Sequence, residues 1–193
     1  MNKDKVLEIF RSTGGLLDGH FLLTSGLHSP QYFQCAKVLQ YPQHADTLCG
    51  EIASHFSDKD IDVVIAPAVG GITVAQEIGR HLGTRIIFAE REGGDMTLRR
   101  GFELAQGEKV LVVEDVVTTG GSVREVMDIV RQAGAEILGL GLIVDRSGGK
   151  AQFDVDMFSI MQMDVVTYQP DVCPLCEQGL PLVKPGSRKA STK

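Results

Sequence analysis

Two adjacent carboxylates and a turn rich in hydroxyls and glycines form the most chemically suggestive segment of the chain. Glu114 and Asp115 end an apolar run, and the sequence TTGGS (118–122) follows, ahead of an amphipathic helical pattern. The start of a helix offers free backbone N–H groups and a partial positive charge, which suit a phosphate dianion. Gly120 and Gly121 allow close approach of the backbone, and the neighbouring hydroxyls are further donors. The turn is therefore a candidate phosphate site.

The two carboxylates need a different partner, because they would repel a phosphate. Ribose hydroxyls or a hydrated Mg²⁺ ion would satisfy them, so the segment suits a ribose phosphate. The alternative is an ordinary strand–turn–helix corner with a Thr or Ser as its N-cap. That alternative explains the hydroxyls but not the paired acids. The turn lacks the Gly-Lys-Ser/Thr of a Walker loop and the spacing of a dinucleotide fingerprint.

The elements around this segment predict an α/β domain. Short apolar runs rich in Val and Ile lie at 61–66, 85–90, 109–114 and 137–144, with one more candidate strand at 157–163. Helical patterns occupy 4–11, 42–57, 72–82 and 122–133. Continuous apolar strands that alternate with helices indicate a parallel sheet covered on both faces. In such sheets ligands lie beyond the C-terminal ends of the strands.

Three other segments have less regular patterns. Residues 20–35 contain short β-like pieces around a Ser-Gly turn. Residues 90–101 are polar and contain glycines at a place where the alternation of strands and helices would predict a helix. A loop of that length is usually functional or disordered. From Lys184 to Lys193 the chain has no acidic residue and little apolar content, which predicts a disordered tail.

Size and composition narrow the class of protein. A chain of 193 residues suits one compact domain. Its net charge of -6 argues against general nucleic-acid binding. The charged N-terminus lacks a signal peptide's apolar core, and no apolar run reaches the ~18 residues of a membrane span. We therefore expect a cytoplasmic protein without a membrane partner.

The segment VLVVEDVVTTGGS (110–122) resembles the signature by which type I phosphoribosyltransferases bind phosphoribosyl pyrophosphate (PRPP). The resemblance implies the type I fold, a central parallel sheet flanked by helices with a small N-terminal hood. It places a single domain over residues 1–183. The hood would comprise about residues 1–40 together with the C-terminal segment.

Three more segments are similar to the orotate phosphoribosyltransferase family: FLLTSGLHSPQYF (21–33), APAVGGITVA (66–75) and VDRSGG (144–149). They imply transfer of ribose 5-phosphate from PRPP to orotate, giving orotidine 5′-phosphate and pyrophosphate in pyrimidine (UMP) biosynthesis. Two alternatives stay open. One is a phosphoribosyltransferase for a purine or another base, and the other is a PRPP-sensing regulator without turnover.

The resemblance also assigns binding residues. Those expected to bind PRPP are Ala68, Val69, Gly70, Gly71, Glu114, Asp115, Val116, Val117, Thr118, Thr119, Gly120, Gly121 and Ser122. Those expected to bind orotate are Ser25, Gly26, Thr118 and Arg146. Arg146 would make a two-pronged contact with the orotate carboxylate. The alternative for Arg146 is a surface salt bridge beside Asp145, and for residues 68–71 a plain tight turn before a helix.

The expected catalytic residues are Arg91, Arg99, Arg100 and Asp115. Many orotate enzymes carry lysines where this chain has Thr24, Gly70 and Glu92, and the chain has no lysine between positions 86 and 108. We therefore expect the three arginines to neutralise the pyrophosphate. The resemblance further implies Mg²⁺ bound mainly through PRPP, and a homodimer in which residues 90–101 reach the neighbouring site.

A CxxC at Cys173 and Cys176 lacks a second CxxC or a histidine nearby in the sequence. We expect a plain C-terminal turn here, with a zinc site pooled by two subunits as the alternative. No residue is assigned as a metal ligand. The five histidines, His20, His28, His44, His55 and His81, are given no catalytic role.

Overall fold

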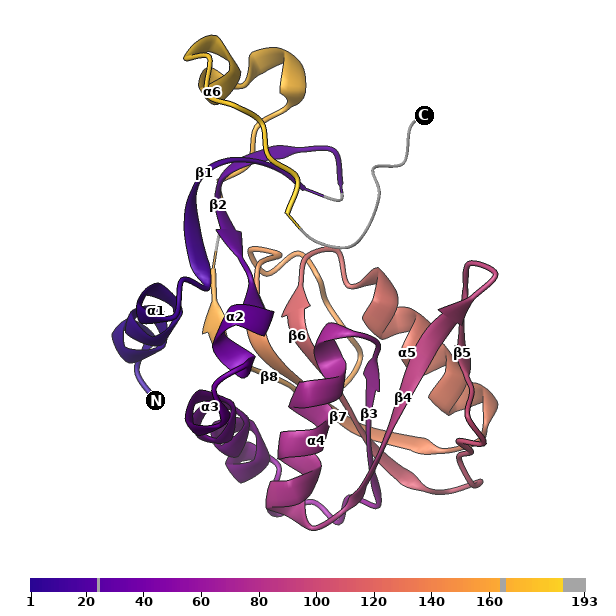
Figure 1. Ribbon diagram of the computed structural model, residues 1–193. Helices are drawn as coiled ribbons and strands as arrows, with labels where there is room; N and C mark the ends of the chain where they lie inside the picture. The colour runs from indigo at the N-terminus through magenta and orange to yellow at the C-terminus, as the bar shows by residue number, and fades with distance from the viewer. Residues whose placement is uncertain (24, 164–165, 186–193) are drawn as a thin grey trace.

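A six-stranded sheet forms the centre of the computed structural model, which describes residues 1–23, 25–163 and 166–185 (Figure 1). The strand order is β5-β4-β3-β6-β7-β8, and every pair is parallel except the antiparallel β4–β5 pair. The strands are β3 (Val63–Pro67), β4 (Arg85–Glu92), β5 (Asp95–Leu98), β6 (Lys109–Val117), β7 (Glu136–Asp145) and β8 (Met157–Gln162). The expected parallel sheet is confirmed.

Both faces of this sheet are buried, which is why its strands are continuous apolar runs. Along β3, Val63 and Ile65 face one core cluster, whereas Val64 and Ala66 face the other. The four side chains are 0% exposed. A strand with two dry faces has no position for a polar side chain until it ends. The acids of β6 accordingly come at its C-terminal end.

The helices cover the two faces unequally. α1 (Lys3–Ser12), α2 (Cys35–Leu39), α3 (Pro42–His55) and α4 (Gly70–Leu82) pack into one core cluster, and α5 (Gly121–Gln132) packs into the other. α3 begins with Pro42, whose missing N–H costs nothing in a first turn. α4 ends where Gly83 adopts a left-handed φ of 70°. Of these five helices, only the short α2 has no counterpart among the predicted ones.

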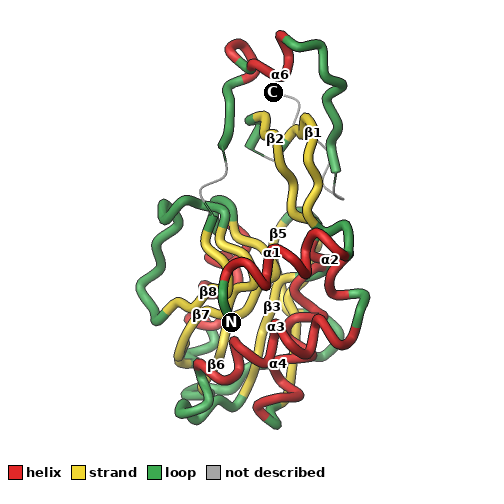
Figure 2. The backbone as a smooth tube through the Cα atoms, turned by 90° about the vertical axis from the view of Figure 1, so that its left-hand side faces the viewer, coloured by secondary structure: helices red, strands yellow, loops and turns green. Residues whose placement is uncertain are grey.

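A second, smaller sheet projects from this body. β1 (Leu16–Leu22) and β2 (His28–Phe33) form an antiparallel hairpin, and C-terminal backbone pairs with both of its edges. Val183 pairs with β1 at Phe21, and Tyr168 pairs with β2 at His28. Residues 166–185 also contain a 3₁₀ turn, η1 (Pro170–Val172), and α6 (Pro174–Glu177). We call β1, β2 and residues 166–185 the hairpin lobe (Figures 1 and 2).

The expectation of an irregular loop at 90–101 is wrong for most of that segment. β4 continues to Glu92, and β5 pairs back on it, with Ala89 opposite Leu98. Gly93 and Gly94 make the turn with φ values of 63° and 109°. A Gly-Gly pair suits the left-handed conformations of a two-residue hairpin turn. The hairpin was not predicted because the side chains at its tip are polar and exposed. They therefore lack the alternation of apolar and polar residues that marks a half-buried strand.

The predicted disordered tail lies almost wholly outside the described residues, as does Thr24. Within the described residues, no helix combines the length and the apolar composition that crossing a membrane would require.

Candidate active site

The candidate site lies where the order of the strands reverses. The chain passes from β3 outward to β4 and then returns to β6 on the other side of β3. Loops that leave β3 and β6 in opposite directions open a crevice at the C-terminal edge of the sheet. A cavity of about 540 Å³ occupies this position, and the hairpin lobe contributes Leu22, Leu23 and Tyr32 to its wall.

Most of the residues expected to bind substrates line this cavity. They are Ser25, Ala68, Val69, Gly70, Arg91, Arg146 and the continuous segment 114–122. Gly26, Gly71, Arg99 and Arg100 are not among the lining residues. Segments separated by more than a hundred positions in the chain thus converge on one cavity, as the resemblance implied.

The turn before α5 is built to present backbone amides. Gly120 adopts a left-handed φ of 78°, and a Cβ on it would lie 2.7 Å from Cζ of Phe153. Only glycine therefore fits this position. α5 begins at Gly121 without a side-chain cap, so the alternative of a corner capped by Thr or Ser is wrong. The uncapped first turn leaves N–H groups for an anionic ligand.

Arg124, which the sequence analysis did not single out, fixes the shape of this turn. Its Nη1 donates to the carbonyl oxygen of Thr119 at 2.7 Å, and its Nη2 donates to that of Gln152 at 3.1 Å. The guanidinium stacks 4.8 Å from the Phe153 ring centroid. Because Arg124 binds carbonyl oxygens, it does not occupy the backbone N–H groups of the turn, which remain available on the cavity side. In the sequence, Arg124 was indistinguishable from an ordinary exposed helix residue.

The acidic pair lies between the loops that follow β3 and β6. A Cβ built on Gly70 would lie 2.6 Å from Oδ2 of Asp115, and one on Gly71 would lie 3.1 Å from Oε1 of Glu114. The two glycines therefore make room for the carboxylates. Burial raises the pKa of Asp115, although the Val116 amide donates to its Oδ1 at 2.9 Å. The peptide bond between Ala68 and Val69 is cis.

Arg146 is a buried residue that also lines the cavity. Only 8% of the residue is exposed, and its Nε has no hydrogen-bond partner within the described chain. Its guanidinium carbon lies 5.6 Å from the ring centroids of both Tyr32 and Phe33. Burial lowers the pKa of Arg146. A buried guanidinium with an unsatisfied donor is suited to an anionic ligand.

The alternative of a salt bridge between Arg146 and Asp145 is wrong. Asp145 is fully buried, and its carboxylate accepts from the Ser147 amide at 2.8 Å and from Nε2 of Gln162 at 3.2 Å. No carboxylate within the described residues lies in salt-bridge range of Arg146. Asp145 therefore stabilises the loop after β7, and the Arg146 guanidinium remains available to a ligand in the cavity.

Two more residues near the cavity escaped the sequence analysis. Tyr32 lines the cavity beside Arg146, and burial raises its pKa. The Cys35 thiol donates to the carbonyl oxygen of Asp115 at 3.7 Å. Burial, followed by the charges of Asp115 and Glu114, holds the pKa of Cys35 well above its usual range. Such a thiol is a neutral packing group and a poor nucleophile.

The three expected loop cations lie on or beside the β4–β5 hairpin. Arg91 lines the cavity, and its guanidinium binds Glu125 and the carbonyl oxygen of Gly94. Arg100 donates to Glu90 at 2.8 Å, and Arg99 lies 3.1 Å from Glu92. In this conformation Arg99 and Arg100 are paired within their own hairpin and not with groups of the cavity.

The CxxC segment forms a turn, but one reason for expecting a plain turn was wrong. The sequence shows no histidine near Cys173 and Cys176. The fold, however, brings His20 of the hairpin to 3.6 and 3.7 Å from the sulfurs of Cys173 and Cys176, and His28 to 3.4 Å from that of Cys176. These histidines are more than 140 positions away in the chain. A search for ligands close in sequence could not have found them.

Comparison with known proteins places this architecture in a family. Residues 37–172 match the model of the phosphoribosyl transferase domain. The chain is 58% identical over 188 residues to "Orotate phosphoribosyltransferase" of Chlorobium phaeobacteroides, covering 97% of each chain. It is 54% identical to the protein of the same name from Caldicellulosiruptor bescii, covering 98% of this chain and 100% of that one.

A solved structure gives the same fold at lower sequence similarity. The crystal structure of orotate phosphoribosyltransferase from Aeropyrum pernix superposes with a TM-score of 0.69 at 22% identity, covering 82% of this chain and 93% of that one. The fold and the cavity define a type I phosphoribosyltransferase. The chain belongs to this family and, within it, to the orotate phosphoribosyltransferases.

Proposed function

We propose that this protein transfers the 5-phosphoribosyl group of PRPP to orotate, giving orotidine 5′-phosphate and pyrophosphate in UMP synthesis. The observation that carries the choice of base is Arg146, a buried guanidinium with an unsatisfied donor on a cavity whose opposite wall suits a ribose phosphate. Orotate differs from the purine bases in bearing a carboxylate, and Arg146 supplies the fixed cation that such a group needs.

In this proposal each part of PRPP has its own wall of the cavity. The 5-phosphate binds the uncapped amides and hydroxyls of residues 118–122, where α5 begins. The ribose diol binds Glu114 and Asp115. The pyrophosphate lies against the backbone of residues 68–71, where glycines leave the amides accessible. Val116 and Val117 join these parts and continue the cavity wall.

The base lies between the hairpin lobe and the loop after β7. Arg146 binds the orotate carboxylate with two parallel N–H donors. Thr118 donates to the ring from the phosphate turn, and backbone groups of Ser25 and Gly26 meet its edge. The aromatic ring of Tyr32 lies on the same wall as Arg146. Recognition therefore combines one charge with a flat, half-enclosed pocket.

Catalysis in this site is electrostatic and needs no nucleophilic side chain. The bond from C1′ to the pyrophosphate oxygen breaks with both electrons leaving on pyrophosphate. N1 of orotate, having lost its proton to solvent, supplies the electron pair of the new bond to C1′. Arg91, Arg99 and Arg100 stabilise the charge on the leaving group, and Asp115 lies near the cationic sugar. For Arg99 and Arg100 this requires the β4–β5 hairpin to move toward a cavity, which in the dimer proposed below is that of the neighbouring chain.

The donor set also fits Mg²⁺ carried in mainly by PRPP. Carboxylate oxygens are the ligands that Mg²⁺ prefers, and Asp115 presents one beside the wall proposed for pyrophosphate. The bound ion would neutralise part of the pyrophosphate charge. We further propose a cytoplasmic homodimer in which residues 90–101 reach the neighbouring site.

The test is a parallel assay with orotate, hypoxanthine and adenine, each with PRPP and Mg²⁺. We expect the absorbance of orotate to fall as product forms, with no turnover of the two purines. Turnover of a purine would replace the proposal with a purine phosphoribosyltransferase. Binding of PRPP by calorimetry without turnover of any base would replace it with a PRPP sensor.

A further inference from the structure

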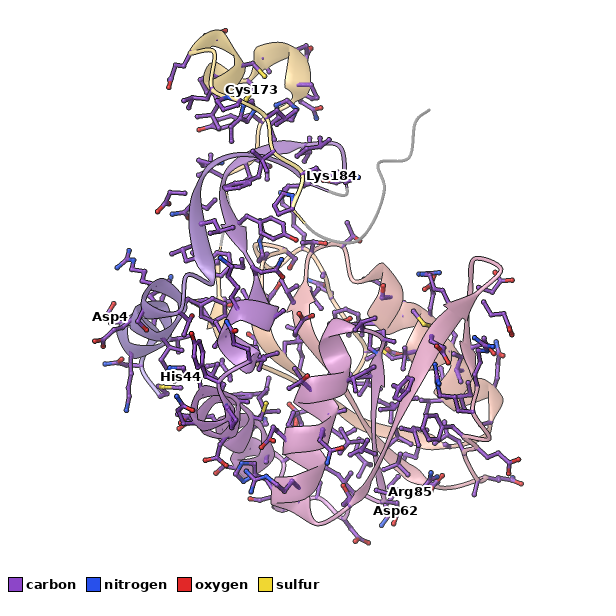
Figure 3. All side chains as sticks on the ribbon, viewed as in Figure 1. Asp4, His44, Asp62, Arg85, Cys173 and Lys184 are labelled. Atoms are coloured by element: carbon purple, nitrogen blue, oxygen red, sulfur yellow. The ribbon has the colours of Figure 1, made fainter. Side chains whose placement is uncertain are left out.

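Four side chains with metal-binding atoms converge in the hairpin lobe, away from the cavity. His20 comes from β1 and His28 from β2, whereas Cys173 and Cys176 flank the start of α6. The two histidines and Cys173 are at most 5% exposed, and Cys176 is exposed. Figure 3 shows Cys173 at the outer end of the molecule. The cluster thus joins two segments from opposite ends of the chain.

The spacing of the four atoms is close to that of a tetrahedral metal site. One ligand atom from each side chain lies within 4.8 Å of all the others. Nε2 of His20 lies 2.9 Å from Nδ1 of His28, and 3.6 and 3.7 Å from the sulfurs of Cys173 and Cys176. Tetrahedral zinc bonds of about 2.0–2.3 Å place their ligand atoms roughly 3.3–3.8 Å apart. Small movements of the two imidazoles would complete this geometry.

The orientation of His20 is already fixed as it is in many metal sites. Its Nδ1 lies 2.9 Å from the carbonyl oxygen of Leu180. A carbonyl can only accept, so Nδ1 carries the proton, and Nε2 of the neutral ring has its lone pair directed at the cluster. Metal-bound histidines are commonly held by this kind of hydrogen bond to the second ring nitrogen.

We propose that His20, His28, Cys173 and Cys176 bind one Zn²⁺ ion as a structural site within a single chain. Two thiolates and two imidazoles make the donor set of a closed, four-coordinate zinc site, without an open position for substrate. The two thiols lose their protons to solvent as the ion binds. The site is separate from the Mg²⁺ and PRPP of the proposed transferase reaction.

The hairpin lobe has little else to hold its C-terminal part in place. Of residues 166–185, all of which the structure describes, Cys173 is the only buried one. Val172, Leu180 and Val183 are 64%, 42% and 50% exposed. Segments that bury so little apolar surface generally need a disulfide or a metal to stay folded. A zinc ion would fasten residues 166–185 to the hairpin.

By binding residues 166–185 to the hairpin, zinc would also stabilise the part of the hairpin lobe that lines the proposed base site. Leu22 of β1 and Tyr32 of β2 line the cavity, as does Pro185. The zinc ligands His20 and His28 lie on these same strands. Zinc would therefore act as a positioning element for the orotate wall without touching substrate.

Metal content of the full-length, untagged protein tests the proposal directly. After purification with a reducing agent and dialysis against dilute zinc, we expect about one zinc ion per chain by mass spectrometry of the metals. Cys176→Ser and His28→Gln should retain less than about a tenth of it, because a three-ligand remainder binds weakly. Cys49→Ala removes a thiol outside the cluster and His44→Gln an imidazole outside it. Both controls should keep the full zinc content.

Two further measurements keep the test informative if a variant folds poorly. Cobalt in place of zinc should give the visible absorption of tetrahedral thiolate coordination in the wild-type protein. Removal of zinc by a chelator should speed hydrogen exchange in residues 16–33 and 166–183, and leave the exchange of β3 and β6 unchanged. The proposal is overturned if the wild type takes up no zinc, or if the Cys176→Ser and His28→Gln variants bind as much as the wild type. A Cys173–Cys176 disulfide in reduced preparations would overturn it too.

Discussion

At the scale of single residues, we propose that Arg146 selects the base. Replacing it with glutamine removes a charge-assisted, two-pronged contact, so we expect kcat/KM for orotate to fall by about 10- to 100-fold, equivalent to roughly 1.5–3 kcal/mol. Arg131→Gln is the matched control, since Arg131 pairs with exposed Asp128 and Asp154 on the outer side of α5. Equal kcat/KM values for the wild type and the Arg146 variant would refute this role.

Asp115 illustrates how a binding site can cost stability. Its pKa is raised by burial, so the folded protein holds the proton more tightly than the unfolded chain, and ionisation near neutral pH opposes folding. Asp115→Asn removes that charge, while Oδ1 can still accept from the Val116 amide. We expect an unchanged or higher Tm at pH 7, by up to about 4 °C, with at least a tenfold loss of turnover.

The dependence on pH gives this prediction its sign. As the pH falls through the raised pKa of Asp115, the wild-type carboxylate becomes protonated and uncharged. The free energy of unfolding of the wild type then approaches that of the asparagine variant, whose side chain is uncharged at every pH. The difference in Tm between the two proteins should therefore shrink toward acid pH. Asp128→Asn, at an exposed position of α5, should show no such convergence. A Tm advantage that grew toward acid pH would contradict the assignment.

At the scale of elements, we propose that the β4–β5 hairpin and the residues beside it carry the cations that neutralise pyrophosphate. Arg99 and Arg100 pair with Glu92 and Glu90 in this conformation, so the proposed role requires them to exchange these partners for pyrophosphate. Arg99→Ala with Arg100→Ala should lower kcat by at least about tenfold, roughly 1.4 kcal/mol. The double lysine variant keeps both charges and should retain most of the turnover. A loss below tenfold in the alanine variant would exclude these cations from the reaction.

The central sheet could be predicted from the sequence because burial on both faces leaves an unbroken apolar run, as in 61–66 and 109–114. The strand–turn–helix at 110–122 could be predicted for the same reason, with its acids at the strand end. The β4–β5 hairpin could not, because residues 91–95 at its tip are exposed and polar, and only Met96 and Leu98 of the short β5 pack against the core. Arg124 and the pairing of His20 with Cys173 were also missed. Those contacts depend on how distant segments fold together, which local spacing does not encode.

At the scale of the whole molecule, the proposed dimer can be tested by combining two inactive chains. Suppose that the β4–β5 hairpin acts in the neighbouring site. The chain with Asp115→Asn then supplies an unaltered hairpin, and the chain with Arg99→Ala and Arg100→Ala supplies unaltered carboxylates at Glu114 and Asp115. Co-expressed in equal amounts, half of the dimers are mixed, and each has one intact site of two. The mixture should therefore recover about a quarter of wild-type activity.

The outcome distinguishes sites shared between chains from sites complete within one chain. Self-contained sites would give only the average of the two parental activities, whatever the oligomeric state. A mixture of Asp115→Asn with Arg146→Gln provides the control, because both positions belong to the cavity of one chain. If the sites are shared, every cavity in this mixture carries one of the two substitutions, whichever chain supplies the hairpin. Activity should therefore stay at the average of the two single variants. Recovery in this control would show that complementation does not report on the hairpin.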